Sequence, residues 1–241
     1  MILARRWPLL LGAAVFLAGC ASGTGSAGPA GTTQSRSAAP ASSPAVAATP
    51  SPTAAPSPSV LPVAPGAGLL HQTMTRPTTT GPAFHALVAD LWLAVQTGKP
   101  FLAHPAFFPV GAYQQVKAIY DPAADWRNRL WADFAVDVKA AHVLLGRDAR
   151  AVRLVRVIVA AADATWIPPG ACYNNIGYWH VSNSRVVYKI HGQERSFGIA
   201  SLISWRGVWY VVHFGGITRP VVGMVDAPAA GPGSPGPQGG C

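Results

Sequence analysis

The sequence predicts an α+β domain in which N-terminal helices pack on a curved antiparallel sheet of about four or five strands. Apolar residues recur at spacings of three and four between about residues 82 and 145, which is typical of helices. After Gly146 the period changes to two and β-branched residues dominate, which is typical of strands. Helices first and antiparallel strands after are the order expected when helices cover one face of a sheet.

The first predicted helix begins near Pro82 and ends near Gly98. Prolines interrupt residues 99–109, which predicts an apolar loop rather than a regular helix. A short helix is then expected over about residues 110–119. The stripe that predicts the first helix consists of Phe84, Leu87, Val88, Leu91, Trp92 and Val95.

A long helix is predicted to start at Asp121, whose side chain can cap it, with Pro122 in the first turn, where the missing N–H costs nothing. Gly146 ends this helix, and Asp125 and Arg129 have the spacing of a surface ion pair. Its buried face is expected to consist of Trp126, Leu130, Phe134, Val138, Ala141 and Leu145.

Two features of the long helix have alternative interpretations. Asp133 and Asp137 share a face, either as a carboxylate pair or as solvated charge, and we favour solvated charge. The tryptophans follow the apolar stripe, which favours a place in the core over a ligand platform.

The strands are predicted from alternation and from turn residues. One strand should run over residues 152–166 until Pro168-Pro169-Gly170 stops it, and a second extended segment is expected over 176–181. A meander over residues 185–190, 195–204 and 208–214 follows, with turns at His191-Gly192 and Arg206-Gly207.

The strand over residues 195–204 has one bulky face and one face of serine, glycine and alanine. The space beside the small residues is either filled by other parts of the domain or left as a ligand cavity. The last strand is apolar on both faces, so helices should cover one of them. The other face predicts a partner, either a second copy or another envelope protein.

The ends of the chain differ in composition from this domain. Residues 21–80 are mainly Ala, Ser, Thr, Gly and Pro, which predicts a disordered linker, and Gly and Pro dominate the C-terminus. The expected organisation is a signal peptide over 1–19, a linker over 20–80, an α+β domain over 81–222 and a disordered tail over 223–241.

The N-terminus combines a charged start, an apolar stretch over residues 7–18 and the run Leu17-Ala18-Gly19-Cys20. This run resembles the lipobox of bacterial lipoprotein precursors. The resemblance implies cleavage before Cys20, a diacylglycerol on its thiol, and anchoring on the outer face of the cell membrane, or in the outer membrane of a diderm cell. Arg5 and Arg6 leave the export route open between the general and the twin-arginine pathways.

Charge and motifs exclude several classes of function. The chain has 18 basic and 9 acidic residues, and an exported basic surface meets anionic headgroups and wall polymers rather than nucleic acid. The histidines lack metal-ligand spacing, so no metal is predicted. The glycines of residues 23–28 match a dinucleotide fingerprint without the strand and helix it needs, so no cofactor is predicted.

Residues 204–213, with Gly207, Trp209 and an alternating strand, resemble the last hairpin of the nuclear transport factor 2-like (SnoaL-like, cystatin-like cone) superfamily. The resemblance implies helices packed in a cone-shaped sheet. Enzymes of this superfamily, such as steroid isomerases and polyketide cyclases, use carboxylates, histidines and tyrosines inside the cone. The chain departs from its usual pattern because no strand is predicted before Asp121.

Two functions are carried forward. The first is a non-catalytic, lipid-anchored module that binds a small apolar or amphiphilic ligand or another protein. The second is an isomerase, dehydratase or cyclase, with acid–base candidates Asp163, Tyr178, His180 and His213. The candidate ligand-binding residues are Tyr173, Asn174, Tyr178, His180, Trp209 and His213.

Two cysteines remain once Cys20 is lipidated. Outside the cell Cys172 and Cys241 can pair, but Cys241 ends a Gly/Pro-rich tail with nothing to hold it near Cys172, so the pairing stays open.

Overall fold

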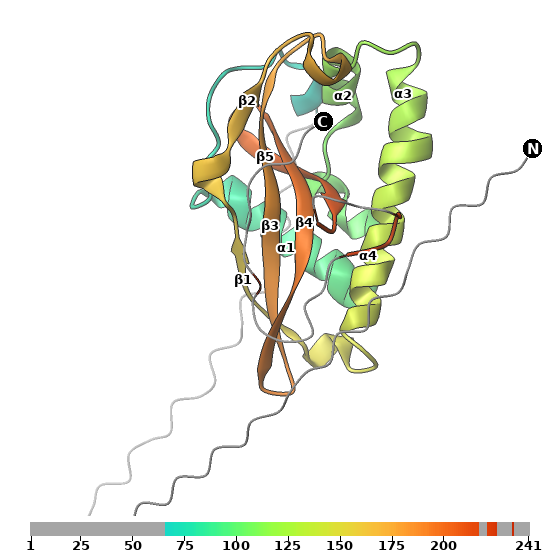
Figure 1. The fold of residues 1–241 in the computed structure, drawn as a ribbon. Coiled ribbons are helices and arrows are strands. Elements are labelled where there is room, and N and C mark those ends of the chain that lie inside the picture. The colour runs from blue at the N-terminus through green and yellow to red at the C-terminus, as the bar shows by residue number, and fades with distance from the viewer. Residues whose placement is uncertain (1–65, 217–220, 226–232, 234–241) are drawn as a thin grey trace, which may run out of the picture. The chain divides into compact units, whose positions relative to one another are not determined.

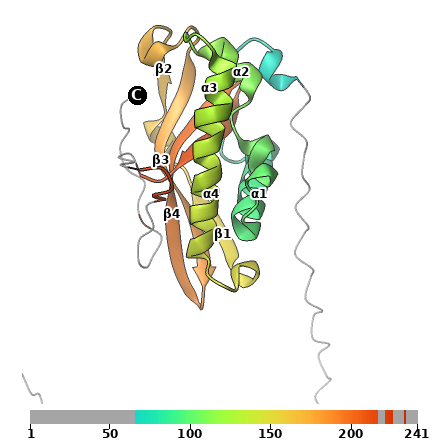
Figure 2. The ribbon, with the colours of Figure 1, turned by 90° about the vertical axis from the view of Figure 1, so that its right-hand side faces the viewer.

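The computed structural model describes residues 66–216, 221–225 and Gly233. Helices α1 and α4 lie side by side on one face of an antiparallel sheet (Figures 1 and 2). This arrangement confirms the predicted α+β class. The helices are α1 (Pro82–Thr97), α2 (Val110–Val116), α3 (Pro122–Asp125) and α4 (Ala132–Leu144), and the strands are β1 (Arg153–Ile158), β2 (Thr165–Ile167), β3 (Tyr178–Ile190), β4 (Gln193–Trp205) and β5 (Val208–Phe214).

The first helix forms where the sequence predicts it, and α2 begins at the predicted residue but ends at Val116, three residues earlier than predicted. Phe84, Leu87 and Leu91 of α1 are buried, and Gly98 ends this helix in the left-handed conformation, with φ of 66°. The predicted loop that follows is instead a 3₁₀ helix, η2 (Pro100–Ala106). Its prolines prevent an α-helix but permit the shorter 3₁₀ turns.

The long helix runs through α3, a π-helical segment (Trp126–Trp131) and α4. The Asp121 carboxylate caps it by accepting a 2.8 Å hydrogen bond from the Ala124 N–H. Arg129 forms the predicted ion pair with Asp125 at 2.5 Å. All six residues of the predicted apolar face are buried, which places Trp126 in the core as expected.

Asp137 contradicts the interpretation of its carboxylate as solvated charge. Its side chain is fully buried, with Oδ2 accepting a hydrogen bond from the Phe214 N–H and Oδ1 accepting one from the Gly223 N–H. Backbone donors at the end of β5 stabilise this carboxylate inside the domain.

Two predicted strand boundaries are wrong. The strand expected over 152–166 is divided into β1 and β2 by the 3₁₀ turn η5 (Ala161–Asp163), because the alanines there supply no β-branched side chains to extend the pairing. Conversely, residues 178–181 of one predicted segment and the whole predicted segment 185–190 belong to the single 13-residue strand β3. This strand continues through Asn183, whose φ of 59° an asparagine tolerates.

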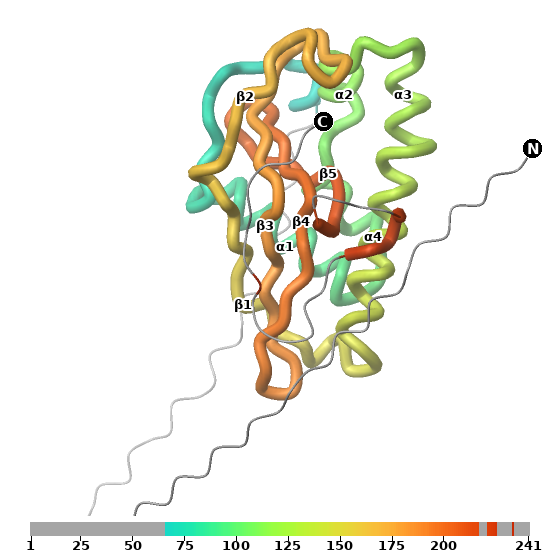
Figure 3. Tube along the Cα trace, in the orientation of Figure 1, coloured from blue at the N-terminus to red at the C-terminus, as the bar shows by residue number. Residues whose placement is uncertain are grey.

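The sheet order is β1-β3-β4-β5, and β2 also pairs with β3. Both predicted hairpin turns are present: φ is positive at His191 and Gly192 and again at Arg206 and Gly207, as in type I′ turns. The tube in Figure 3 shows the long β3 and β4 running together to the first of these turns.

Side chains on both faces of β5 are buried. On the helix side, Phe214 meets Phe134 of α4 edge to face, with ring centroids 5.2 Å apart. On the hairpin, the Trp205 indole N–H donates to the Ala67 carbonyl at 3.0 Å. Residues 208–212 are buried or nearly so, and the second copy or envelope protein suggested by the sequence stays a prediction.

The domain extends beyond both predicted boundaries. The Gln72 amide donates to the Ser204 carbonyl at 2.9 Å, and the Trp179 indole donates to the Met74 carbonyl at 3.0 Å. At the other end, the Val225 carbonyl accepts from the Gly198 N–H at 3.1 Å. The predicted start at residue 81 is thus too late, and the predicted end at 222 is too early. The signal peptide and most of the predicted linker lie outside the described residues.

Candidate functional site

The sequence-predicted binding residues do not form one site. Tyr173 is largely exposed, whereas Asn174, Tyr178 and Trp209 are buried. His180 and His213 are half-buried. These residues are therefore divided between the surface and the interior of the domain.

The two histidines flank Ser201 of β4. His180 Nε2 lies 2.9 Å from Ser201 Oγ, and His213 of β5 lies opposite Ser201 in the pairing of β4 with β5. Burial lowers the pKa of His180 to about 4 and raises the pKa of Tyr178 above its ordinary value. A weakly basic imidazole and a phenol that keeps its proton are poorly matched to acid–base catalysis at neutral pH.

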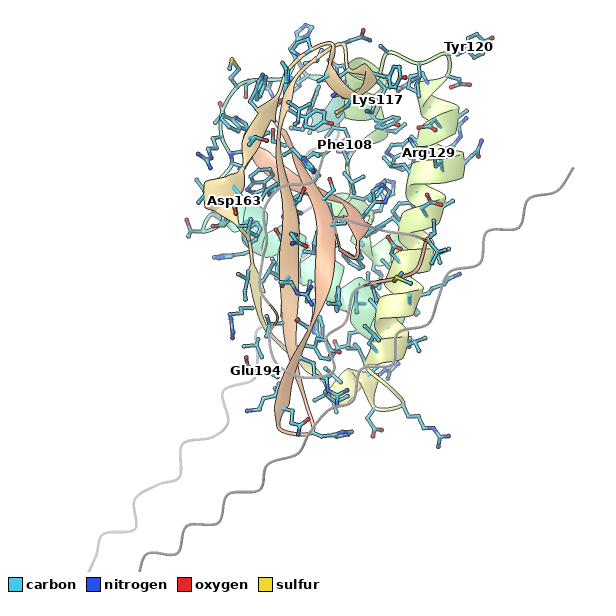
Figure 4. All side chains as sticks on the ribbon, in the orientation of Figure 1. Phe108, Lys117, Tyr120, Arg129, Asp163 and Glu194 are labelled. Atoms are coloured by element: carbon cyan, nitrogen blue, oxygen red, sulfur yellow. The ribbon has the colours of Figure 1, made fainter. Side chains whose placement is uncertain are left out.

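The fourth acid–base candidate, Asp163, is exposed on the 3₁₀ turn η5, and Figure 4 shows it at one side of the domain. Cys172 forms a disulfide bond. Both Cys20 and Cys241 lie outside the described residues, so the pairing of Cys172 with Cys241 stays a prediction.

Among the described residues, the cavity found between the helices and the sheet is small. This cavity, lined by Trp92 of α1, Phe197 of β4 and Phe214 of β5 among others, measures about 10 Å³. Such a volume holds about one water molecule. On the opposite face, Ser196 accepts hydrogen bonds from the buried Arg185 side chain, at 3.2 Å from Nε and 2.9 Å from Nη2. Ser196, one of the small residues of β4, therefore adjoins a packed side chain on this face.

A polar cluster joins α2 to the long helix. The Tyr113 hydroxyl donates to Asp125 Oδ2 at 2.5 Å, and Arg129 Nη2 donates to the same hydroxyl at 2.9 Å. The hydrogen bond from Arg129 lowers the pKa of Asp125, and burial raises the pKa of Tyr113. Because these groups bond to one another, the cluster stabilises the packing of α2 against the long helix.

A pocket of about 620 Å³ opens at the end of the domain where α1, α4 and the β3–β4 hairpin meet. We call it the basic pocket. Glu194, labelled in Figure 4, marks the hairpin at this end. The pocket is lined by Gln96, Thr97, Lys99, His142, Arg147, Asp148, Ala149, Arg150, Ala151, Val152, Lys189, Ile190 and His191.

Backbone hydrogen bonds shape the basic pocket. The Gln96 side-chain amide donates to the carbonyls of Arg150 and Val152 at 3.1 and 3.0 Å, which holds the loop after α4 against α1. His142 Nδ1 lies 2.9 Å from the Val95 carbonyl, which ties α4 to α1. These hydrogen bonds therefore fix the backbone of the segments that carry the lining cations.

The charges of the basic pocket are strongly unequal. Four permanent cations and two histidines line it, against the single carboxylate of Asp148. Its volume is in the range of small-molecule sites. Anionic groups such as phosphate, sulfate and carboxylate fit this lining, since arginine and lysine are their usual ligands. The four cations are Lys99, Arg147, Arg150 and Lys189.

Sequence reasoning missed this pocket because its cations come from separate segments. Arg147 and Arg150 lie in one loop, three residues apart, but Lys99 and Lys189 are distant in sequence and only the fold brings them to the pocket. The one available signal was the excess of basic residues in the whole chain.

No family model, no curated protein and no solved structure matches this chain. Among the described residues, no group of three or more histidine, cysteine, aspartate or glutamate side chains is placed to hold a metal ion. Within the same residues, every helix is too short or too polar to cross a bilayer.

Proposed function

We propose that this protein is an exported, lipid-anchored module that holds an anionic ligand in the basic pocket without catalysing a reaction. The observation that supports this function best is the set of four cations, opposed by one carboxylate, around a pocket of about 620 Å³. The small cavity between helices and sheet favours this ligand class over the apolar one expected from the sequence.

The proposed anchor is a diacylglycerol on Cys20, which would keep the domain at the outer face of the cell membrane. Two or more acyl chains anchor a protein stably, whereas a single chain binds only marginally. Anionic headgroups, wall polymers and charged metabolites are all available in that location. The resemblance to the nuclear transport factor 2-like superfamily remains part of the proposal and assigns no reaction to this chain.

Calorimetric titration of the purified full chain with tripolyphosphate, citrate and sulfate tests the pocket. We expect binding of tripolyphosphate that weakens with added salt, because the pocket cations are largely exposed. Replacing Lys99 and Lys189 together by alanine should weaken binding about tenfold or more, which corresponds to about 1.4 kcal/mol.

The double variant Arg127→Ala and Lys139→Ala is the matched control, because both residues are exposed on the long helix outside the pocket and their replacement also removes two positive charges. This variant should bind like the parent chain. If the control lost as much affinity for tripolyphosphate as the pocket variant, the effect would come from net charge and not from the pocket. Failure of the parent chain to bind any of the three anions would refute the proposed ligand class.

A further inference from the structure

Five large apolar or aromatic side chains are exposed at one end of the domain, which we call the apolar end. It carries α2 and the 3₁₀ turn η1 (Ala67–Leu69), and Figures 1 and 2 show it opposite the β3–β4 hairpin that borders the basic pocket. The exposed fractions are 75% for Leu69, 54% for Leu70, 37% for Ile119, 105% for Tyr120 and 79% for Tyr173.

Hydrogen bonds bring these residues together from three separate segments. The Gln115 amide of α2 donates to the Gly68 carbonyl at 2.7 Å, which seats η1 on this helix. The Ala118 N–H donates to the Tyr173 carbonyl at 2.8 Å, which places Tyr173 beside the residues that follow α2. Figure 4 labels Tyr120 at the same end.

The backbone at this end is strained around an exposed aromatic residue. Cys172 and Tyr173 have φ of 55° and 56°, a left-handed conformation that costs about 1 kcal/mol or more per non-glycine residue. Tyr173 stays on the surface at this cost, between the disulfide-bonded Cys172 and the buried Asn174. Strained backbone persists where the surrounding structure fixes it, and it is common at functional sites.

The chain itself indicates what meets the apolar end. Residues 21–65 join Cys20 to Gly66, and the described structure begins at Gly66, immediately before η1. A lipid on Cys20 would therefore tether the domain from this end. Tyrosine, leucine and isoleucine are side chains that settle at the boundary between headgroups and acyl chains.

We infer that the apolar end docks on the membrane that holds the Cys20 lipid, with Leu69, Leu70, Ile119, Tyr120 and Tyr173 in the interface. The inference rests on the lipid anchor of the proposed function. Docking in this orientation turns the basic pocket away from the bilayer and toward ligands outside it.

Hydrogen exchange of the lipidated full chain on vesicles of phosphatidylethanolamine and phosphatidylglycerol tests this orientation. The reference is the Cys20→Ser full chain in solution. We expect exchange to slow several-fold over residues 67–71 and 117–121 on vesicles, with no change over the hairpin residues 189–195. The double variant Leu69→Asp and Tyr120→Asp should lose this protection while it stays bound through its lipid.

Val143→Asp is the matched control, because Val143 on α4 is also 75% exposed but lies outside the apolar end. The control should keep the protection. The intact mass of the chain is measured first, because it shows whether a lipid is attached at Cys20. A chain without lipid would refute both the anchor and the docking. A lipidated chain without protection at the apolar end, or with protection at the hairpin instead, would overturn the docking while the anchor stands.

Discussion

Asp137 of α4 accepts a hydrogen bond from the backbone N–H of Phe214 at 3.1 Å, through Oδ2, inside the domain. Its second oxygen accepts from the Gly223 N–H at 2.9 Å. One carboxylate thus joins the long helix to the end of β5 and to the segment over residues 221–225. These bonds are charge-assisted and therefore stronger than neutral ones.

Asp137→Asn should lower the free energy of unfolding by about 1–3 kcal/mol. The asparagine side chain has one oxygen, so its NH₂ group would face one of the two backbone N–H donors and lose that hydrogen bond. Urea denaturation measures the change. Asp133→Asn, a partly exposed position on the same helix, should change stability by no more than about 0.5 kcal/mol. Equal effects at the two positions would contradict the role of Asp137.

The stability of the domain should depend on pH through His180. Its pKa is about 4 in the folded protein and 6.5 ordinarily, so between these values the unfolded chain binds more protons. The contribution of the neutral His180 side chain to stability is complete above pH 6.5. As the pH falls toward 4 this contribution is lost, which lowers the free energy of unfolding by about 2–3 kcal/mol. Urea denaturation across this window should show a flatter profile for His180→Gln, and parallel profiles would contradict the lowered pKa.

The two hairpin glycines form a matched pair. Gly192 and Gly207 have φ of 80° and 75°, so alanine at either position costs about 1 kcal/mol of backbone strain. At Gly207 the added Cβ would also lie 2.9 Å from Thr75 Cγ2, whereas nothing lies within 4 Å at Gly192. Gly207→Ala should therefore lower the melting temperature more than Gly192→Ala.

Thr75→Ser removes the crowded methyl group and should recover the additional loss caused by Gly207→Ala. Differential scanning fluorimetry of the three variants, Gly192→Ala, Gly207→Ala and Gly207→Ala combined with Thr75→Ser, measures the melting temperatures. Similar melting temperatures for the two glycine variants would show that residues 70–77 do not pack on the β4–β5 hairpin.

Gln96→Ala should weaken anion binding without changing any charge. The variant loses the two hydrogen bonds that hold the Arg150 and Val152 carbonyls, so we expect a loss of stability of about 1 kcal/mol and weaker binding of tripolyphosphate. Gln114→Ala, at an exposed position on α2, is the control. Unchanged affinity despite lower stability would show that the loop does not need Gln96 to present its arginines.

The elements with strong local signals could be predicted from the sequence. Periodicity and capping residues placed α1 and the long helix, and alternation after the Arg206-Gly207 turn placed β5 at its observed bounds. The division between β1 and β2 had only a weak local signal, the alanines of η5, because both strands pair with the same strand β3. Such interruptions depend on tertiary pairing.

Packing contacts made by polar groups were also not predicted from the sequence. Residues 66–80 pack through groups such as the Gln72 amide, which leave no apolar periodicity in the sequence. Asp137 did carry a signal, because it lies within the stripe formed by Phe134, Val138 and Ala141, where a solvated carboxylate does not belong. The basic pocket carried none beyond net charge, because distant segments supply its cations.

The edges of the sheet leave little backbone for another chain to pair with. On one side β1 and β2 are short, and the register shifts between Leu154 and Arg156. On the other side the Val211 carbonyl accepts from the Phe108 N–H at 3.1 Å, and Asp137 occupies the Phe214 N–H. Short, irregular or covered edges oppose strand-to-strand aggregation. Many copies of this domain could therefore crowd on one surface and stay separate.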